Sequence, residues 1–222
     1  MTFSIAAKCL ETGMFGCAII TTNMGCGSRA IFAKAGTGAV LSQAWSNPGL
    51  GPIGIQLLSD GKNADETIKG MVKADRFPGW RQLAVVDKDG KTAIYTGDKI
   101  TSTQAYATAP GAIAAGNGIV HERVAQGMID GYLRMPKMHF GYRLLHALDG
   151  GVAAGGQAKQ LHSAALMIVD DLAFPIVDLR VELDSDPLRE LHFLWEIYRP
   201  QIETYRLRAM DPGNAPSVEY LV

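Results

Sequence analysis

The sequence has almost no net charge and few cysteines. Lys and Arg together number 21 and Asp and Glu number 22, which gives a formal net charge of −1 over 222 residues. A surface that binds nucleic acid needs an excess of Lys and Arg to neutralise phosphates, and no run of five basic residues occurs. Cys9, Cys17 and Cys26 have no CxxC spacing, which argues against a zinc site and a disulfide framework. We therefore expect no nucleic-acid partner and three reduced cysteines.

Long apolar runs and familiar ligand-binding motifs are also missing. No apolar stretch reaches the roughly 18 residues of a membrane-spanning helix, and the first residues lack the basic and apolar regions of a signal peptide. The five histidines show no HxH, HxxxH or HExxH spacing. Walker A and GxSxG motifs are absent, which removes the P-loop nucleotide and α/β-hydrolase classes. These absences predict a cytoplasmic protein with no membrane partner, no metal and no cofactor.

Hydrophobic patterning predicts strands and helices that come in blocks. Runs of β-branched and apolar residues indicate strands, and they cover residues 2–8, 15–22, 30–34, 38–43, 83–86, 92–96, 112–115, 164–169 and 176–183. Helical spacing of apolar residues predicts two helices between residues 51 and 72, then one over about 120–134, one over about 138–149 and one that begins at Pro187. Blocks of this kind favour an α+β fold in which helices cover antiparallel sheets.

Several local signals support these elements. Asp87-Lys88-Asp89-Gly90 is typical of a hairpin turn. Asn63 and Glu66 have the spacing of a capping box, and Asp186 before Pro187 is typical of a helix start. The glycine-rich residues 150–156 predict a loop.

The chain length allows one large domain, because a chain of this size buries roughly 70% of its unfolded surface. We place this domain at residues 1–199. Residues 200–222 form a C-terminal tail whose polar, proline-containing end predicts packing on a second subunit, which would make the protein a homo-oligomer, in the simplest case a homodimer.

Thr2 is the candidate nucleophile. Removal of Met1 would leave Thr2 with a free α-amine at the start of a strand-like run. The α-amine has a pKa near neutrality, so it can take the proton from the hydroxyl of the same residue. The alternative is that Thr2 is an ordinary β-branched strand residue.

Eight short segments together carry a resemblance to a known family. They are Thr2-Phe3-Ser4-Ile5, Lys34-Ala35-Gly36-Thr37-Gly38-Ala39-Val40, Gln43-Ala44-Trp45-Ser46-Asn47-Pro48, Arg81-Gln82-Leu83-Ala84-Val85-Val86-Asp87, Thr96-Gly97, Gly116-Asn117, Ser163-Ala164-Ala165-Leu166 and Val177-Asp178-Leu179-Arg180-Val181. This ordered set, which spans about residues 2–195, is similar to an uncharacterised bacterial and archaeal domain family of the Ntn-hydrolase superfamily. The resemblance implies a four-layer αββα sandwich like that of proteasome subunits. It also implies a Thr, Ser or Cys nucleophile at the mature N-terminus and hydrolysis of an amide bond, but no particular substrate.

Lys34 matches a further feature of proteasome-like enzymes, in which a lysine about one hairpin after the nucleophile lowers the pKa of the α-amine. A buried ammonium there would disfavour the protonated amine; the alternative is an exposed strand lysine. The acidic partner of such a lysine is missing from residues 17–22. Asp178 is a candidate to replace it, although Asp178 and Arg180 share a strand face and are equally placed for a structural ion pair.

Four other polar residues are candidates for the oxyanion hole or for substrate binding. Gln43 and Asn47 carry amides that suit either role, and Asn47 alternatively shapes the turn before Pro48. Asn117 lies between two glycines after a predicted strand, where backbone amides could hold an oxyanion or form only a tight turn. Ser4 shares a strand face with Thr2.

Two functions remain open from the sequence. The first is hydrolysis of an amide bond in a small molecule or peptide by an Ntn-type amidohydrolase. The second is a non-catalytic Ntn-fold protein that binds a ligand or takes part in an assembly, and that tolerates a retained Met1. Fold analogy alone does not choose between them.

Overall fold

Two antiparallel sheets form the centre of the protein in the computed structural model, which describes residues 1–216. The six-stranded sheet has the order β10-β9-β2-β1-β8-β7. Its strands are β1 (Thr2–Lys8), β2 (Phe15–Thr21), β7 (Gln104–Ala109), β8 (Ala112–Asn117), β9 (Ser163–Val169) and β10 (Val177–Val181). The four-stranded sheet has the order β3-β4-β5-β6, with β3 (Ile31–Lys34), β4 (Gly38–Ala44), β5 (Arg81–Asp87) and β6 (Thr92–Thr96).

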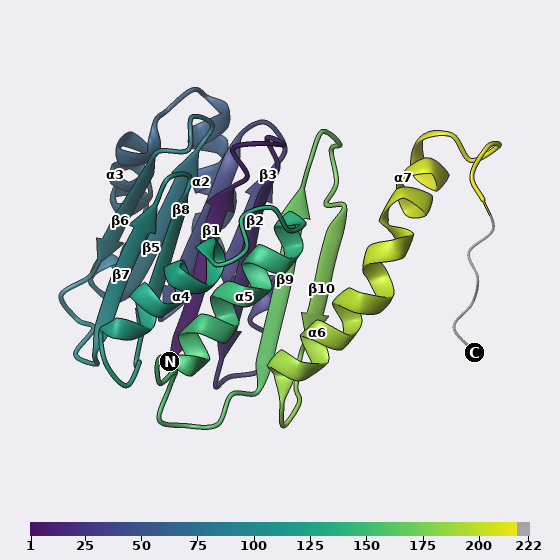
Figure 1. The fold of residues 1–222 in the computed structure, drawn as a ribbon. Coiled ribbons are helices and arrows are strands. Elements are labelled where there is room, and N and C mark those ends of the chain that lie inside the picture. The colour runs from purple at the N-terminus through teal and green to yellow at the C-terminus, as the bar shows by residue number, and fades with distance from the viewer. Residues whose placement is uncertain (217–222) are drawn as a thin grey trace.

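Helices cover the outer face of each sheet, and Figure 1 shows α4, α5 and α6 in front of the larger one. These helices are α4 (Arg123–Leu133), α5 (Phe140–Ala153) and α6 (Pro187–Tyr198), and the other sheet is covered by α2 (Leu50–Ser59) and α3 (Ala64–Ala74). The short elements are α1 (Gly27–Ala30), η1 (Pro78–Trp80), η2 (Arg199–Gln201) and α7 (Ile202–Met210). The predicted α+β fold with αββα layers is therefore confirmed.

The central strand β1 is buried on both faces. Phe3 and Ile5 pack into the cluster beneath the helices, whereas Ala6 packs into the cluster between the two sheets. Because successive side chains of a strand point to opposite faces, Thr2 and Ser4 face the second sheet together with Ala6. The first strand of the chain thus presents its polar residues to the space between the sheets.

The local signals in the sequence are confirmed. β5 and β6 pair as the predicted hairpin, Asn63 and Glu66 form a capping box at the start of α3, and the Asp186 side chain caps α6. One strand was missing from the prediction: β7 is an edge strand of alternating exposed and half-buried residues. Its run of small side chains lacks the apolar content on which the prediction depended.

The predicted loop over residues 150–156 is wrong in its first half, because α5 continues to Ala153. Glycine is needed here for close packing of two helices: a Cβ at Gly150 would lie 2.1 Å from the carbonyl oxygen of Gly127 in α4. Glycine therefore permits the close approach of α4 and α5, at an entropic cost of about 1 kcal/mol per residue relative to alanine.

The segment predicted as a C-terminal tail, residues 200–222, begins with helical structure: η2 and α7 follow α6. Figure 1 shows α7 extending beyond the sheets. Residues 217–222 of the predicted tail lie outside the described residues, and packing of the tail on a second subunit stays a prediction. Among the described helices, none has the length and apolar character needed to cross a membrane.

Candidate functional site

A cavity of about 700 Å³ opens at the start of β1, and we call it the Thr2 cavity. Thr2, Thr21 and Asn117 line it from the six-stranded sheet, while Ala44 and Trp45 line it from the end of β4. The register of the sheet places Thr2 opposite Thr21 on one side and opposite Asn117 on the other. Three polar side chains from adjacent strands therefore meet at one end of the cavity.

The hydroxyl of Thr2 has a defined hydrogen-bond partner. Its Oγ1 lies 3.0 Å from Oγ1 of Thr21, and the Thr21 hydroxyl donates to the carbonyl oxygen of Met1 at 2.5 Å. A hydroxyl has one hydrogen to donate, so Thr2 must be the donor in the bond between the two threonines. While Met1 is in place, the proton of the Thr2 hydroxyl thus points at another hydroxyl and not at a base.

The residues that line the Thr2 cavity in the described part of the chain include no Asp, Glu or His. Cys26 also lines it, but burial raises the pKa of this thiol to about 11. A thiol that is protonated at neutral pH is a poor nucleophile. The nucleophile that this cavity offers is therefore a hydroxyl, and its described lining provides no carboxylate or imidazole as a general base, with Lys99 as the one lysine there.

A buried chain of amides lies behind Thr2 and joins the two sheets. Ser4 Oγ donates to Gln43 Oε1 at 2.7 Å, and Gln43 Nε2 donates to Gln82 Oε1 at 2.7 Å. Asn117 Nδ2 donates to the same Gln82 oxygen at 3.2 Å, while Gln82 Nε2 donates to the Gly116 carbonyl at 3.1 Å. Buried polar networks with every partner present favour one rigid arrangement, so Asn117 is held in place beside Thr2.

Backbone strain occurs where β4 ends at the cavity. Ala44 has φ of 70°, and no other non-glycine residue among residues 1–216 has a positive φ. This conformation costs an alanine roughly 1–2 kcal/mol. It redirects the chain into the loop that carries Trp45, whose ring contacts that of Trp80 edge to face at 5.4 Å. Strained backbone persists where the surroundings over-determine it, and such positions cluster at functional sites.

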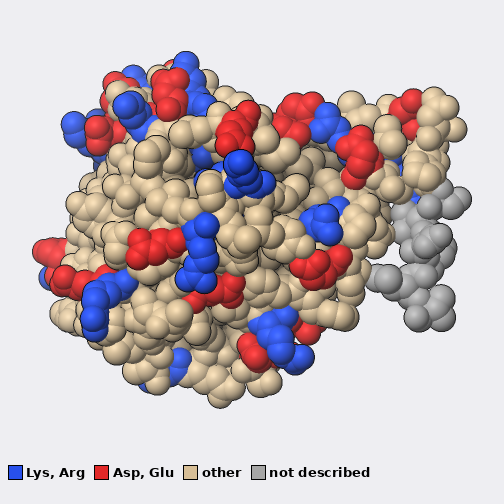
Figure 2. All heavy atoms as spheres, viewed as in Figure 1, with Lys and Arg blue, Asp and Glu red and all other residues tan. Residues whose placement is uncertain are grey.

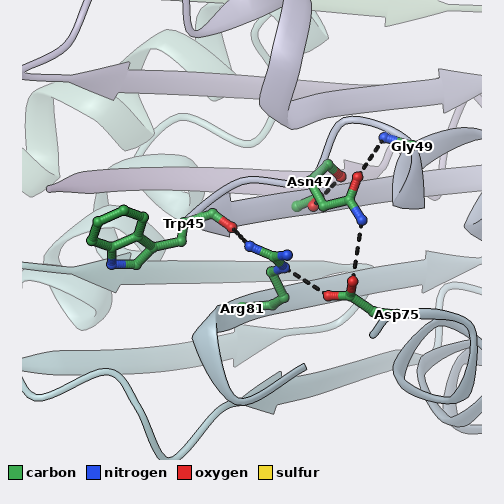
Figure 3. A network of polar contacts seen from close by, with 6 residues as sticks. Trp45, Asn47, Gly49, Asp75 and Arg81 are labelled. Carbon is green, nitrogen blue, oxygen red and sulfur yellow. Dashed lines mark hydrogen bonds and ion pairs between the residues drawn. The ribbon is translucent and has the colours of Figure 1, made fainter. Parts of the chain in front are cut away.

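Polar contacts hold that loop against the neighbouring strand (Figure 3). Arg81 Nε donates to Asp75 Oδ2 at 2.6 Å, and the same guanidinium donates to the carbonyl oxygen of Trp45. Asn47 Nδ2 donates to the other oxygen of Asp75 at 3.3 Å, and Asn47 Oδ1 accepts from the Gly49 amide at 3.1 Å. One carboxylate therefore positions the tryptophan wall of the cavity through Arg81.

Comparison with known proteins places the chain in a family. A family model described as a family of unknown function, DUF1028, matches residues 2–191. The chain belongs to this family. Protein SPO2555 from Silicibacter pomeroyi, whose crystal structure is described with the same family, is 29% identical, has a TM-score of 0.82, and the match covers 88% of this chain and 85% of that one.

Other solved structures are more distant from this DUF1028 protein. A Gly-1 mutant of Anbu from Hyphomicrobium sp. strain MC1 is 15% identical with a TM-score of 0.44, and the match covers 100% of both chains. Anbu, the ancestral beta-subunit, from Yersinia bercovieri is 12% identical with a TM-score of 0.40, covering 99% of this chain and 100% of that one. No curated protein sequence matches the chain.

Lys34 of the DUF1028 chain does not lie at the Thr2 cavity, and the prediction that it tunes the α-amine has to be corrected. Its side chain is exposed, and Nζ donates to Ser59 Oγ at 2.9 Å. The register pairs Lys34 with Gly38 at the hairpin end of β3, whereas Ala30, just before the other end of that strand, lines the cavity. The spacing between Thr2 and Lys34 matched the expected pattern, but β3 runs away from the Thr2 cavity, so the Lys34 ammonium lies at the far end of the strand.

Two other predicted residues also lie elsewhere. Asn47 is half-buried in the loop of Figure 3 and does not line the cavity, so its turn-forming alternative describes it. Asp178 is on the edge strand β10, where its two oxygens accept from Arg180 at 2.7 and 2.8 Å. That contact is the structural ion pair, and Asp178 is not the acidic partner of Lys34.

The structure brings together Thr2, Ser4, Gln43 and Asn117 of the predicted set, and it adds residues that sequence reasoning missed. Thr21 and Gln82 are the main additions. The predicted hairpin of the first two strands could have indicated Thr21, because pairing Lys8 with Phe15 places Thr2 opposite Thr21. No signal in a single sequence shows that Gln82 meets Asn117.

Replacement of Asp75 with asparagine is expected to lower the free energy of unfolding by about 1–3 kcal/mol at pH 7, because Arg81 loses its charged partner. Burial alone would raise the pKa of Asp75, but hydrogen bonds from Arg81 and other donors hold it below its ordinary value. A lowered carboxyl pKa stabilises the fold above the unfolded value, about 3.9, and this contribution is lost as pH falls through the folded pKa.

Urea unfolding of D75N at pH 7 and near pH 3 measures this effect. The difference from the wild type should shrink at the lower pH, and D89N, which alters an exposed turn carboxylate, should unfold like the wild type. An unchanged midpoint for D75N at pH 7 would contradict the role of this ion pair.

Proposed function

We propose that this protein is an amide hydrolase of the Ntn type whose nucleophile is Thr2, made competent by cleavage of the Met1–Thr2 peptide bond. The observation that carries the proposal is the position of the Thr2 hydroxyl in the wall of a cavity whose described lining offers no Asp, Glu or His. A hydroxyl in such a place has one base within its own residue, the free α-amine. Placement of the family in the Ntn superfamily is part of the same proposal and is supported by the αββα layers.

The reaction follows from these groups. The Thr2 oxygen attacks the carbonyl carbon of the substrate amide while the α-amine takes the hydroxyl proton. The carbon–nitrogen bond then breaks, the leaving amine takes that proton from the ammonium, and the acyl group stays on Thr2 as an ester. Water then attacks the ester carbon while the α-amine takes a proton from the water. The bond from that carbon to the Thr2 oxygen breaks, the oxygen takes the proton back from the ammonium, and the carboxylic acid leaves. Each step returns the proton that it takes, so no cofactor is required.

Thr21 and Asn117 are the residues that we propose to assist. Cleavage after Met1 removes the carbonyl that accepts from Thr21, which frees the Thr21 hydroxyl to donate to Thr2. Asn117 uses one hydrogen of its amide group on Gln82, and the amide group has two. The second hydrogen is the candidate donor to the oxyanion, while Ser4 and Gln43 hold the amide chain behind it.

The rate of hydrolysis is expected to rise with pH through an apparent pKa below the ordinary α-amine value of about 8. Burial lowers the pKa of the α-amine at Met1, and the positive charge of Lys159 lowers it further; an amine on Thr2, one residue deeper, is subject to the same burial. K159Q should raise this apparent pKa, because removing a nearby positive charge stabilises the ammonium.

The measurement is kcat/KM against pH for K159Q, with K137Q, which alters another exposed lysine, as the matched control. An apparent pKa that does not move in K159Q, or that moves equally in K137Q, would contradict this assignment.

Intact mass and a covalent probe test the proposed function. The purified protein should lack Met1, and a β-lactone should add its mass once, at Thr2, since it acylates a hydroxyl activated by an amine. T2A should not react. A purified protein that keeps Met1 and forms no adduct with the β-lactone would contradict the proposed hydrolase activity.

The second candidate is a ligand-binding protein that keeps Met1, and the contacts of Met1 favour it. The Met1 side chain packs against Gly118, where a Cβ would lie 2.2 Å from Met1 Cγ, and the Met1 carbonyl accepts from Thr21. This candidate predicts saturable ligand binding without hydrolysis.

A further inference from the structure

The charged side chains that line the Thr2 cavity, among the residues described, are all positive. Arg29, Arg81 and Lys99 line it, and no acidic residue does so among those described. The protein as a whole carries a formal net charge of −1, and Figure 2 shows blue and red side chains interspersed over the face viewed there. The lining therefore differs from the rest of the chain in its charge.

Among the described residues 1–216, two of the three cations lack a carboxylate partner. Arg81 is neutralised by Asp75. The guanidinium of Arg29 donates to the carbonyl oxygens of Met24 and Gly25, at 2.7 and 3.1 Å, which orients it without cancelling its charge. Within residues 1–216, neither Arg29 nor Lys99 forms an ion pair.

The nearby carboxylates do not change this balance at the cavity wall. Asp98 adjoins Lys99 in sequence and lies beside Gly79, and Glu182 lies beside Gly25. Neither lines the cavity and neither forms an ion pair with the two cations. Arg29 and Lys99 therefore remain available to an anion that enters the Thr2 cavity.

An aromatic wall adjoins these cations. Trp45 is 68% exposed and Trp80 is 39% exposed, and both line the cavity. Tryptophan is enriched at interfaces, where its ring offers a large apolar surface. Trp45 follows the strained turn at Ala44 and its carbonyl accepts from Arg81, while its backbone amide donates to the carbonyl oxygen of Trp80 at 3.2 Å. The wall offers apolar surface to a ligand whose charged end reaches the cations.

We infer that the Thr2 cavity binds amides that carry a free carboxylate, of the class of N-acylated amino acids. The carboxylate would pair with Arg29 and Lys99, the apolar part would lie on Trp45 and Trp80, and the amide would reach Thr2. This inference deepens the proposed function and rests on it for the role of the amide. Binding of the carboxylate itself does not require hydrolysis.

Titration of T2A with a panel of N-acetyl amino acids tests the inference, because T2A lacks the hydroxyl and cannot form an ester. The panel contains small, aliphatic and aromatic side chains, each as the free acid and as the neutral primary amide. Fluorescence of Trp45 and Trp80 reports binding, since the third tryptophan, Trp195, is buried against α5. At least one acid is expected to bind about tenfold more tightly than its amide.

Charge removal provides the matched variants. R29Q and K99Q, each made in T2A, should weaken binding of that acid about tenfold and reduce its salt dependence between about 0.02 and 0.2 M, while K34Q should bind like the parent. Equal affinity of acids and amides, unchanged affinity in R29Q and K99Q, or no saturable binding of any acid would each overturn the inference.

These outcomes are distinguishable from failure of the proposed function. A wild-type protein that binds the acids but hydrolyses no amide would retain the carboxylate site and lose the hydrolase. Hydrolysis of neutral amides without preference for acids would do the reverse.

Discussion

T2A is expected to lose amide hydrolysis by about a thousandfold or more, the range seen when a catalytic nucleophile is removed. The variant keeps an α-amine, the cavity and the polar network behind it, so the loss would belong to the hydroxyl. T2S keeps both the hydroxyl and the amine and should retain measurable turnover. Within residues 1–216 the Thr2 hydroxyl forms a hydrogen bond with one side chain, that of Thr21, so the cost to stability should stay near 1 kcal/mol.

Hydrolysis of an N-acylated amino acid with a free carboxylate, followed by amine-reactive fluorescence of the released amino acid, measures this loss, with T12A as the control because Thr12 is exposed in the turn between β1 and β2. Wild-type turnover in T2A would contradict a role for the Thr2 hydroxyl. Thermal unfolding of each variant separates loss of chemistry from loss of fold.

Q82L is expected to lower the free energy of unfolding by about 3 kcal/mol. Leucine fills similar volume but leaves the amide groups of Gln43 and Asn117 and the carbonyl of Gly116 without their buried partner. Each such loss costs roughly 1–3 kcal/mol, and relaxation recovers part of the sum. Turnover should also fall, because Asn117 is no longer held beside Thr2.

Urea unfolding measures the stability change, and Q126L is the matched control because Gln126 is exposed on α4. The double variant Q43L/Q82L should cost less than the sum of the two single changes, since the groups belong to one network. A loss below 1 kcal/mol in Q82L would contradict the view that this network joins the sheets.

Much of the fold could be predicted from the sequence. Strand and helix periodicity, the hairpin after Asp87 and the capping box at Asn63 depend on residues within a few positions of one another. The edge strand β7 could not be predicted because it has little apolar character. The end of α5 could not be predicted because Gly150 is required by close packing against Gly127 of α4, which lies far from it in the sequence.

The candidate site was predicted in part. Alternation along β1 places Thr2 and Ser4 on one face, and the structure confirms that they face the second sheet, where Ser4 meets Gln43. Lys34 was misplaced because chain spacing alone does not say which end of a strand reaches the cavity. Asn47 was misplaced because its amide is taken up by its own loop.

The elements, and the alternation that places Thr2 and Ser4 on one face of β1, follow from local backbone geometry and are encoded in short segments of the chain. Which side chains meet depends on the tertiary structure. Gln82 and Asn117 lie on strands of different sheets, and Arg29, Lys99 and the two tryptophans come from separate segments. Their meeting depends on how two sheets are registered and stacked, and that arrangement is a property of long-range packing that no short segment carries.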